Sequence, residues 1–302
     1  MSTLGNTAFL VIGGDGLIGN ALAHRLKQEN CEVVATTRRL VTTETSELFL
    51  DLTEKFEEFL KNKKISHLVE RGPLTAVLAA AMTRIADCAM DEPRSRLVNM
   101  TMTVDLGRKL LANGIDVVFL SSNAVFSGEI AYPTEYTVPD PSTTYGNQKA
   151  EAEHELLSFH AKMANPPRLK IVRLTKVLHK SLPLIERWIS DLRLGKTISA
   201  FQDRQFSPIS LQYAVNELAR IATLGSSGIY HLSGNPDLSY CEFAKLLAAK
   251  LGVSLDLVQA ELALFGSGLM QHYSALGATS VGCDLSIEPE SPDAVIRNLL
   301  KQ

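Results

Sequence analysis

The chain has 302 residues, of which 45% are hydrophobic and 21% are charged, and its formal net charge is −3. This length suits one large α/β domain, alone or with a smaller lobe, and the charge gives no long-range attraction toward nucleic acid. The four cysteines, Cys31, Cys88, Cys241 and Cys283, lack disulfide or metal-ligand spacing, and we expect no metal, no membrane contact and a cytoplasmic location.

Short apolar runs alternate with amphipathic helical stretches through the first half of the chain. Such runs predict buried parallel strands, at 8–12, 32–36, 76–80, 117–121 and 170–174. Because helical stretches separate them, the runs predict βαβ units with right-handed crossovers. The predicted fold class is therefore α/β, a doubly wound parallel Rossmann sheet with a smaller, interleaved substrate-binding lobe.

The pattern loosens after about residue 175, where Pro183, Gly195 and Pro208 interrupt it. Farther along, apolar spacing predicts two helices and a strand, at 211–224, 240–251 and 228–232 respectively. We predict that the nucleotide-binding domain takes residues 1–175, completed by roughly 209–233. The smaller lobe is then predicted to take 176–208 and 234–302.

A glycine-rich turn, Gly13-Gly14-Asp15-Gly16-Leu17-Ile18-Gly19, follows the first strand and opens the first helix. Glycines at this place allow a tight turn and close approach of the backbone to a pyrophosphate, which the N–H groups of the helix N-terminus can bind. We therefore predict dinucleotide contacts from Gly13, Gly16, Leu17, Ile18 and Gly19, against the alternative of a purely structural turn. Asp15 is unexpected, because its carboxylate would repel phosphates unless it pointed outward.

The second strand ends in Thr36-Thr37-Arg38-Arg39 and has no acidic residue there. An acid at this place binds the ribose hydroxyls of NAD, whereas arginines accommodate the 2′-phosphate of NADP. Arg38 and Arg39 therefore favour NADP(H), unless they are solvated surface residues. Asp51 and Leu52 follow the next short strand and are candidates for the adenine edge, although Asp51 equally suits an ordinary turn.

Tyr145 and Lys149 lie one helical turn apart at the start of a predicted helix. A lysine ammonium beside the phenol, with help from an oxidised nicotinamide, is expected to lower the pKa of Tyr145, so that the tyrosine exchanges a proton with a carbonyl or alcohol oxygen. Ser122 ends a buried strand and can hold that oxygen. The alternative for the Tyr/Lys pair alone is a surface contact.

These motifs together resemble the extended short-chain dehydrogenase/reductases, and more closely their dTDP-4-dehydrorhamnose reductase (RmlD-like) branch, which also contains the methionine adenosyltransferase β subunit. The resemblance covers most of the chain and continues through further segments, which are Ala79 to Thr83, Val98-Asn99, Ile171 to Arg173, Phe206 to Pro208 and Gly228 to Gly234.

The resemblance implies an oxidoreductase of nucleotide-sugar metabolism in which Ser122, Tyr145 and Lys149 are catalytic. It implies that Ala79, Ala80 and Ala81 line the cofactor site, and that Lys149 holds the nicotinamide ribose. Asn99 would support Lys149 through water, or be a helix-surface amide. Substrate contacts are expected from Thr83, Ser122, Asn123, Arg173 and Arg204, with a structural salt bridge as the alternative for Arg173.

The favoured function is NADPH-dependent reduction of a nucleotide-activated 4-keto-6-deoxy sugar, and a homodimer is a family expectation. A sugar-nucleotide dehydratase is less favoured, because Asn123-Ala124 stand where the dehydratases carry an acidic pair. An epimerase is less favoured because epimerases usually have an acidic residue on the second strand, and it is missing here. A third alternative is an NADP-binding regulatory subunit, which resembles the methionine adenosyltransferase β subunit.

Overall fold

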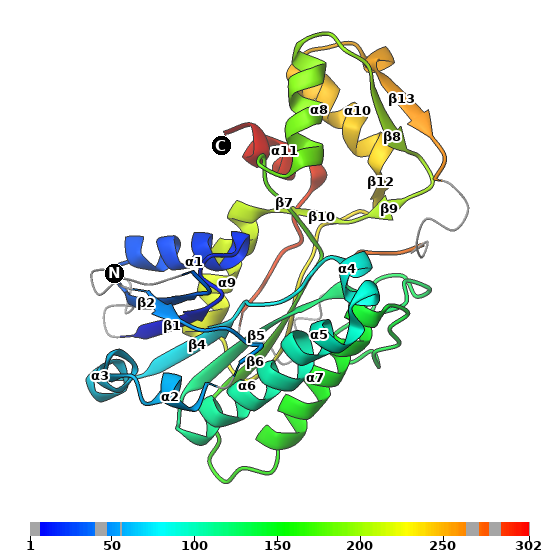
Figure 1. Cartoon of the computed structure of the whole chain (residues 1–302). Helices are drawn as coiled ribbons and strands as arrows, with labels where there is room; N and C mark the ends of the chain where they lie inside the picture. The colour runs from blue at the N-terminus through cyan, green and yellow to red at the C-terminus, as the bar shows by residue number, and fades with distance from the viewer. Residues whose placement is uncertain (1–6, 40–46, 55, 264–271, 278–284, 302) are drawn as a thin grey trace.

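The structure, a computed structural model, describes residues 7–39, 47–54, 56–263, 272–277 and 285–301. Its centre is a parallel seven-stranded sheet with the strand order β11-β6-β5-β4-β1-β2-β3 (Figure 1). The strands are β1 (Ala8–Ile12), β2 (Glu32–Thr37), β3 (Leu48–Phe49), β4 (Leu74–Leu78), β5 (Asp116–Ser122), β6 (Leu169–Leu174) and β11 (Gly228–Leu232). This order confirms the predicted doubly wound fold, and it places a topological switch point between β1 and β4.

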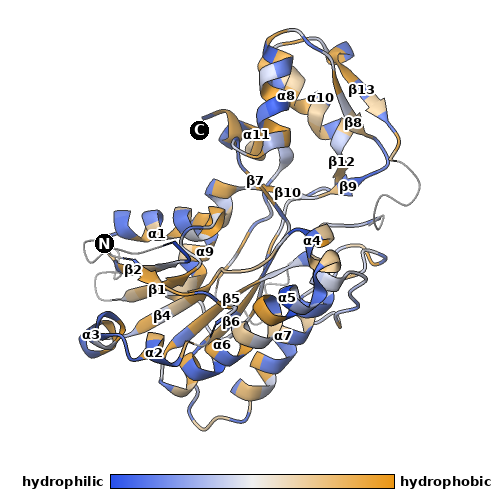
Figure 2. Ribbon diagram, in the orientation of Figure 1, coloured by the Kyte–Doolittle hydropathy of each residue, from blue (hydrophilic) through white to orange (hydrophobic). Residues whose placement is uncertain are grey.

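Helices cover both faces of the sheet because alternate strand residues point to opposite sides. In β1, Leu10 packs into one hydrophobic cluster and Phe9 into the other. The Leu10 side is covered by α2 (Glu57–Leu60), α3 (Lys63–Arg71), α6 (Thr103–Ala112) and α7 (Thr144–His160). The Phe9 side is covered by α1 (Leu17–Gln28) and α9 (Leu211–Leu224). Figure 2 shows the hydrophobic strands between these layers.

A third hydrophobic cluster forms the centre of a smaller lobe, above the sheet in Figure 1. Its helices are α8 (Pro183–Arg193), α10 (Tyr240–Leu251) and α11 (Pro292–Lys301). Three two-stranded pairs accompany them, β7 (Lys176–Leu178) with β10 (Pro208–Ser210), β8 (Ile198–Phe201) with β13 (Val258–Glu261), and β9 (Gln205–Phe206) with β12 (Leu238–Ser239). Where one lobe ends and the other begins stays a prediction.

Several short elements lie at the carboxyl edge of the sheet or in the smaller lobe. They are α4 (Ile85–Met90), α5 (Glu92–Arg96), a π-helical turn η1 (Leu97–Met102) and the 3₁₀ turns η2 (Asn123–Val125) and η3 (Leu255–Leu257). None of the helices in the described ranges is long and apolar enough to cross a membrane. Cys31, Cys88 and Cys241 are buried free thiols, and Cys283 lies outside the described residues.

The helices predicted at 211–224 and 240–251 and the strand at 228–232 are confirmed with the same bounds. The strand predicted at 76–80 is shifted, because β4 begins at Leu74 and ends at Leu78. Ala79 and Ala80 continue the apolar run but have already left the sheet, and composition cannot distinguish them from strand residues. This two-residue shift matters, since both alanines pack against the core and also line the cavity described next.

Candidate active site

The glycine turn is built so tightly that side chains cannot replace three of its glycines. Gly13 has φ +89°, and a Cβ there would lie 2.7 Å from the backbone nitrogen of Ala80. At Gly19 a Cβ would lie 2.2 Å from the carbonyl oxygen of Gly13, and at Gly14 it would lie 2.6 Å from the Cβ of Ala35. The turn therefore exposes backbone without side chains at the carboxyl edge of the sheet. A pyrophosphate requires such a close approach to the backbone.

The N-terminus of α1 points from this turn with its first amide groups uncapped by any side chain. Gly16 is the N-cap residue, and no acidic residue lies in the first turn. Oriented amides and the helix dipole favour an anion at this place. Ile18 packs its side chain on the core, so Leu17 and Ile18 can contribute to a phosphate site only through their backbone.

A cavity of about 430 Å³ opens beside the turn. Most of the predicted cofactor residues line it, namely Gly13, Gly16, Arg38, Asp51, Leu52, Ala79, Ala80 and Ala81. Thr83, which was predicted to contact substrate, lines it as well. Arg39 is not part of the lining that the described residues form. The residues present thus fit an adenine dinucleotide, with a glycine cradle for the pyrophosphate and a single cation from the end of β2.

Sequence reasoning missed several residues of this cavity, Asp15, Thr36, Thr37, Thr53, Met82, Arg84, Asp87 and Arg94. Arg94 comes from α5, for which no helix was predicted. A signal was present, because Asp91 caps that helix by accepting a hydrogen bond from the Arg94 backbone N–H at 3.2 Å, and Pro93 stands in its first turn.

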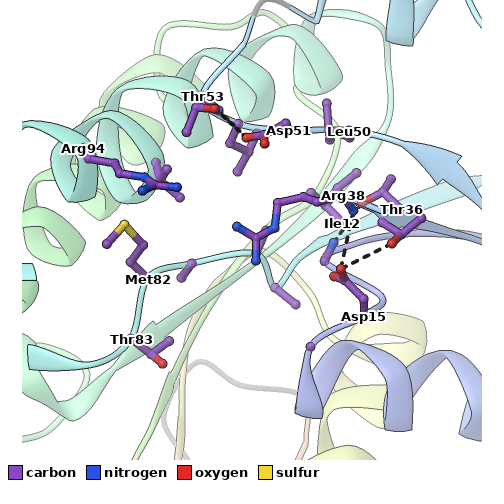
Figure 3. A pocket seen from close by; sticks show the side chains of 18 of the residues that line it. Ile12, Asp15, Thr36, Arg38, Leu50, Asp51, Thr53, Met82, Thr83 and Arg94 are labelled. Carbon is purple, nitrogen blue, oxygen red and sulfur yellow. Dashed lines mark hydrogen bonds between the residues drawn. The ribbon is translucent and has the colours of Figure 1, made fainter. Parts of the chain in front are cut away.

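Asp51 has the turn role left open by the sequence, and its role at the adenine edge stays a prediction. Its carboxylate accepts hydrogen bonds from the backbone N–H and the hydroxyl of Thr53, each at 2.8 Å, as in an ordinary turn. It also lines the cavity, into which the side chains of Arg38 and Arg94 extend from two sides (Figure 3). Burial by itself would raise the pKa of Asp51, but the Thr53 hydrogen bonds and the two arginines outweigh it and lower the pKa.

Ser122 and Tyr145 come together at the carboxyl end of β5. Ser122 is the last residue of that strand, and its hydroxyl accepts a hydrogen bond from the Ala124 backbone N–H at 3.1 Å. Tyr145 lies in the first turn of α7, which Thr143 caps through the Gly146 N–H at 2.9 Å. The Tyr145 phenol is hydrogen-bonded to Ser122. A proton donor and a second hydroxyl thus share one place, as predicted.

Lys149 lies one turn farther along α7 and is also buried. Its ammonium donates a hydrogen bond to the Leu120 carbonyl oxygen at 2.8 Å and lies 4.4 Å from the centroid of the Phe119 ring. Burial lowers the pKa of Lys149 to about 8, although the charge of Glu153 acts in the opposite direction.

The pKa of Tyr145 differs from the expectation. Sequence reasoning predicted that Lys149, helped by an oxidised nicotinamide, lowers it, but in the structure of this chain burial raises it. The phenol packs against Cys88 and Ala124, and the Cys88 thiol raises the pKa further, whereas the hydrogen bond to Ser122 only partly opposes this. Desolvation therefore dominates the pKa of Tyr145, while the Lys149 ammonium is engaged by the Leu120 carbonyl.

Asn99 is fully buried in the π-helical turn, which overturns its alternative as a helix-surface amide. Its side-chain amide accepts from the Met82 backbone N–H at 2.8 Å and donates to the Met82 carbonyl at 2.9 Å. It also donates to the Gln148 side chain at 2.9 Å. Asn99 therefore joins the cavity wall to the helix that carries Tyr145 and Lys149.

A second cavity of about 1010 Å³ lies between α4 and the smaller lobe. Its lining includes Arg204, as predicted for a substrate contact, with Arg187, Trp188 and Tyr240. Helix α4 is the partition between the two cavities, since Asp87 lines the first and Ala86 and Ala89 line the second.

Tyr145 is buried between residues that line the two cavities, although neither it nor Ser122 is among the described residues of either lining. Its ring packs with Met82, which lines the first cavity, while its neighbour Thr144 lines the second.

Arg173, like Ser122 and Tyr145, is not among the described residues that line the two cavities, and its assignment as a substrate contact stays a prediction. Its side chain is 2% exposed, and its guanidinium donates to the Glu153 carboxylate at 2.6 and 3.1 Å. The other face of the guanidinium lies 5.0 Å from the Phe126 ring centroid. The structural salt bridge is thus the alternative that the geometry supports.

The Asn123 side chain bonds to a distant segment. Its amide nitrogen donates to the carbonyl and hydroxyl oxygens of Ser274, at 3.2 and 3.0 Å. Asp237 fixes Ser274 in turn, by accepting from its backbone N–H at 3.0 Å. Ser274, in residues 272–277, therefore lies against Asn123, the residue after Ser122. The sequence did not predict this contact. Within the described ranges, no group of three or more His, Cys, Asp or Glu side chains could hold a metal ion.

Residues 7–263 match the family model described as the RmlD substrate binding domain. The chain belongs to this family. It is 25% identical over 274 residues to the dTDP-4-keto-6-deoxy-D-glucose reductase of Streptomyces niveus, a match that covers 89% of this chain and 88% of the relative. The family assignment confirms the resemblance drawn from the motifs.

Two further comparisons bear on the fold and on the alternatives. The dTDP-4-dehydrorhamnose reductase of Bacillus anthracis, solved in complex with NADP, superposes with a TM-score of 0.78 at 18% identity and covers 97% of this chain and 98% of its own. Methionine adenosyltransferase 2 subunit beta of Rattus norvegicus is 25% identical, but over 151 residues, which are 49% of this chain and 42% of that protein.

Proposed function

We propose that this protein is a reductase that uses NADPH to reduce the carbonyl group of a nucleotide-activated 4-keto-6-deoxy sugar. The observation that carries the proposal is the position of Tyr145, which lies beside Ser122 and is buried between Met82, in the lining of the first cavity, and Thr144, in the lining of the second. The printed activity of the Streptomyces niveus relative supports the same substrate class.

A bound nicotinamide dinucleotide supplies the hydride to the carbonyl carbon. Tyr145 donates its phenolic proton to the carbonyl oxygen, which the Ser122 hydroxyl holds beside it. Because burial raises the pKa of Tyr145, the phenol stays protonated near neutral pH, and this is the form that a reduction consumes. Lys149 places a cation behind the phenol and stabilises the phenolate that remains.

Elimination and epimerisation are both less well supported, epimerisation because no acidic residue ends the second strand. Asn123 stands directly after Ser122, and its amide is bonded to Ser274, so no acid–base pair follows the serine. A regulatory role is the second alternative, and the likeness to methionine adenosyltransferase 2 subunit beta extends over only half of this chain. Ser122, Tyr145 and Lys149 are nevertheless all present and brought together.

The proposal is tested with purified protein, NADPH and a panel of nucleotide sugars, followed by the loss of nicotinamide absorbance. We expect NADPH oxidation with a 4-keto-6-deoxy sugar nucleotide and none with the same nucleotide sugar carrying a 4-hydroxyl group. No turnover with any member of the panel, together with a stable partner enzyme recovered in a pull-down, would instead support the regulatory alternative.

Reduction is expected to lose activity as the pH rises above about 8, because Lys149 is cationic below its pKa of about 8 and neutral above it. The expected profile of kcat/KM is level from pH 6 to 7.5 and falls toward tenfold per pH unit at high pH.

The matched control is Lys170→Met. Lys170 is another buried lysine with a pKa lowered to about 8 by burial, and its ammonium donates to the Ala222 carbonyl, remote from the site. This variant should keep the alkaline limb, and a limb that disappears with Lys170 would contradict the assignment to Lys149.

A further inference from the structure

The Asp15 carboxylate accepts hydrogen bonds from two donors at the end of β2. Its Oδ2 atom accepts a hydrogen bond from the Thr37 hydroxyl at 3.3 Å and from the Arg38 backbone N–H at 3.4 Å, drawn as dashed lines in Figure 3. Both distances are long for hydrogen bonds, so the carboxylate is held loosely and can be displaced. The Thr37 hydroxyl in turn accepts from the Arg39 N–H at 3.0 Å, which keeps the end of the strand in this turn.

This place is where a dinucleotide presents the 2′ position of its adenosine ribose. A 2′-phosphate needs several donors there, and the candidates are the Arg38 guanidinium, the Arg38 backbone N–H and the Thr37 hydroxyl. Asp15 occupies two of the three with an anionic oxygen. A second anion brought to the same donors is repelled by the carboxylate, whereas a 2′-hydroxyl can donate a hydrogen bond to it.

The charges of the cavity wall also oppose the binding of a 2′-phosphate. Among the described residues, three aspartates and three arginines line it, Asp15, Asp51, Asp87, Arg38, Arg84 and Arg94. Asp51 already offsets part of the charge of Arg38 and Arg94, which lower its pKa. The part of the wall that the described residues form therefore has no surplus of cations to meet a phosphate dianion as long as Asp15 keeps its charge.

We propose that Asp15 sets the cofactor selectivity of this protein, by holding a carboxylate at the donors that a 2′-phosphate requires. The inference rests on the proposed function, since it assumes that a nicotinamide dinucleotide binds in the first cavity. It implies that NADPH displaces Asp15 from the Thr37 hydroxyl and the Arg38 N–H. It also implies that this protein binds NADH more tightly than it would if arginines alone stood at the 2′ position.

The test compares the unsubstituted protein with Asp15→Asn by equilibrium titration with NADPH, NADH, adenosine 2′,5′-bisphosphate and 5′-AMP. Asparagine keeps the size of the side chain and removes its charge. The substitution is expected to tighten binding of NADPH and of the bisphosphate about tenfold, and to leave NADH and 5′-AMP unchanged or weaker. The bisphosphate and 5′-AMP isolate the 2′-phosphate from the rest of the dinucleotide.

Asp87→Asn is the matched control, because it removes the same charge from another part of the same wall, where Asp87 faces Arg84 at 3.6 Å. It should change the NADPH to NADH affinity ratio by less than about twofold. Equal shifts for both dinucleotides, an equal shift of the ratio in Asp87→Asn, or unchanged affinities in Asp15→Asn would each overturn the inference while the proposed function stands. If the unsubstituted protein bound neither dinucleotide, both would fail.

Discussion

Tyr145→Phe is expected to reduce kcat for the sugar-nucleotide reduction by roughly 10²- to 10⁴-fold, the contribution typical of a positioned general acid. The substitution removes only the phenolic oxygen. The ring remains packed against Cys88, Ala124 and Met82, so the fold and the first cavity keep their form. We therefore expect the Kd for NADPH to change by less than about threefold, which separates a lost proton donor from a lost binding site.

The control for this variant is Tyr213→Phe. Tyr213 is a second tyrosine whose pKa burial raises, but its hydroxyl donates to the Glu288 carbonyl at 2.8 Å, and its side chain packs on the Phe9 side of the sheet. Steady-state rates of the two variants, each with its dissociation constant for NADPH, make the comparison. Undiminished turnover in Tyr145→Phe would contradict the proposed role of Tyr145 as the proton donor.

Arg173→Met is expected to lower the free energy of unfolding by about 3–5 kcal/mol, the usual cost of removing one partner of a buried ion pair. The Glu153 carboxylate is 3% exposed and would be left in the core, with a neutral hydrogen bond from Ser121 but without its counter-charge. Denaturant unfolding with linear extrapolation measures the loss.

The double variant Glu153→Gln/Arg173→Met tests the reason for that loss. Removing both charges should restore most of the stability, because the cost arises from the uncompensated carboxylate and not from the absence of the guanidinium. An Arg173→Met protein of normal stability with a strongly raised KM for the sugar nucleotide would instead support the substrate contact expected from the family resemblance.

The candidate site divides into parts that were predictable and parts that were not. The glycine turn, Ser122 and the Tyr145–Lys149 pair follow from local spacing, since a strand end, a turn and one helical turn fix their geometry within a few residues. Arg39 was grouped with Arg38 by adjacency, but only Arg38 reaches the cavity. Successive residues at a strand end point to opposite sides, and the sequence does not say which one points inward.

Contacts between distant segments were beyond sequence reasoning. Arg94 lines the first cavity because α5 and the π-helical turn return to the sheet edge, and Ser274 reaches Asn123 across 151 residues of the chain. Glu153 on α7 forms an ion pair with Arg173 on β6, and these two elements meet only in the folded core. In each case a polar side chain had several possible partners, and burial decided among them.

The sequence by itself determined the doubly wound sheet, the place of the glycine turn and the residues that can exchange a proton, because periodicity and backbone freedom act over short distances. The tertiary structure alone decided which charges meet. It buried Arg173 with Glu153, raised the pKa of Tyr145 by desolvation, and set Asp15 on the Thr37 and Arg38 donors. Electrostatic partners depend on distance and solvent exclusion, which exist only once the chain is packed.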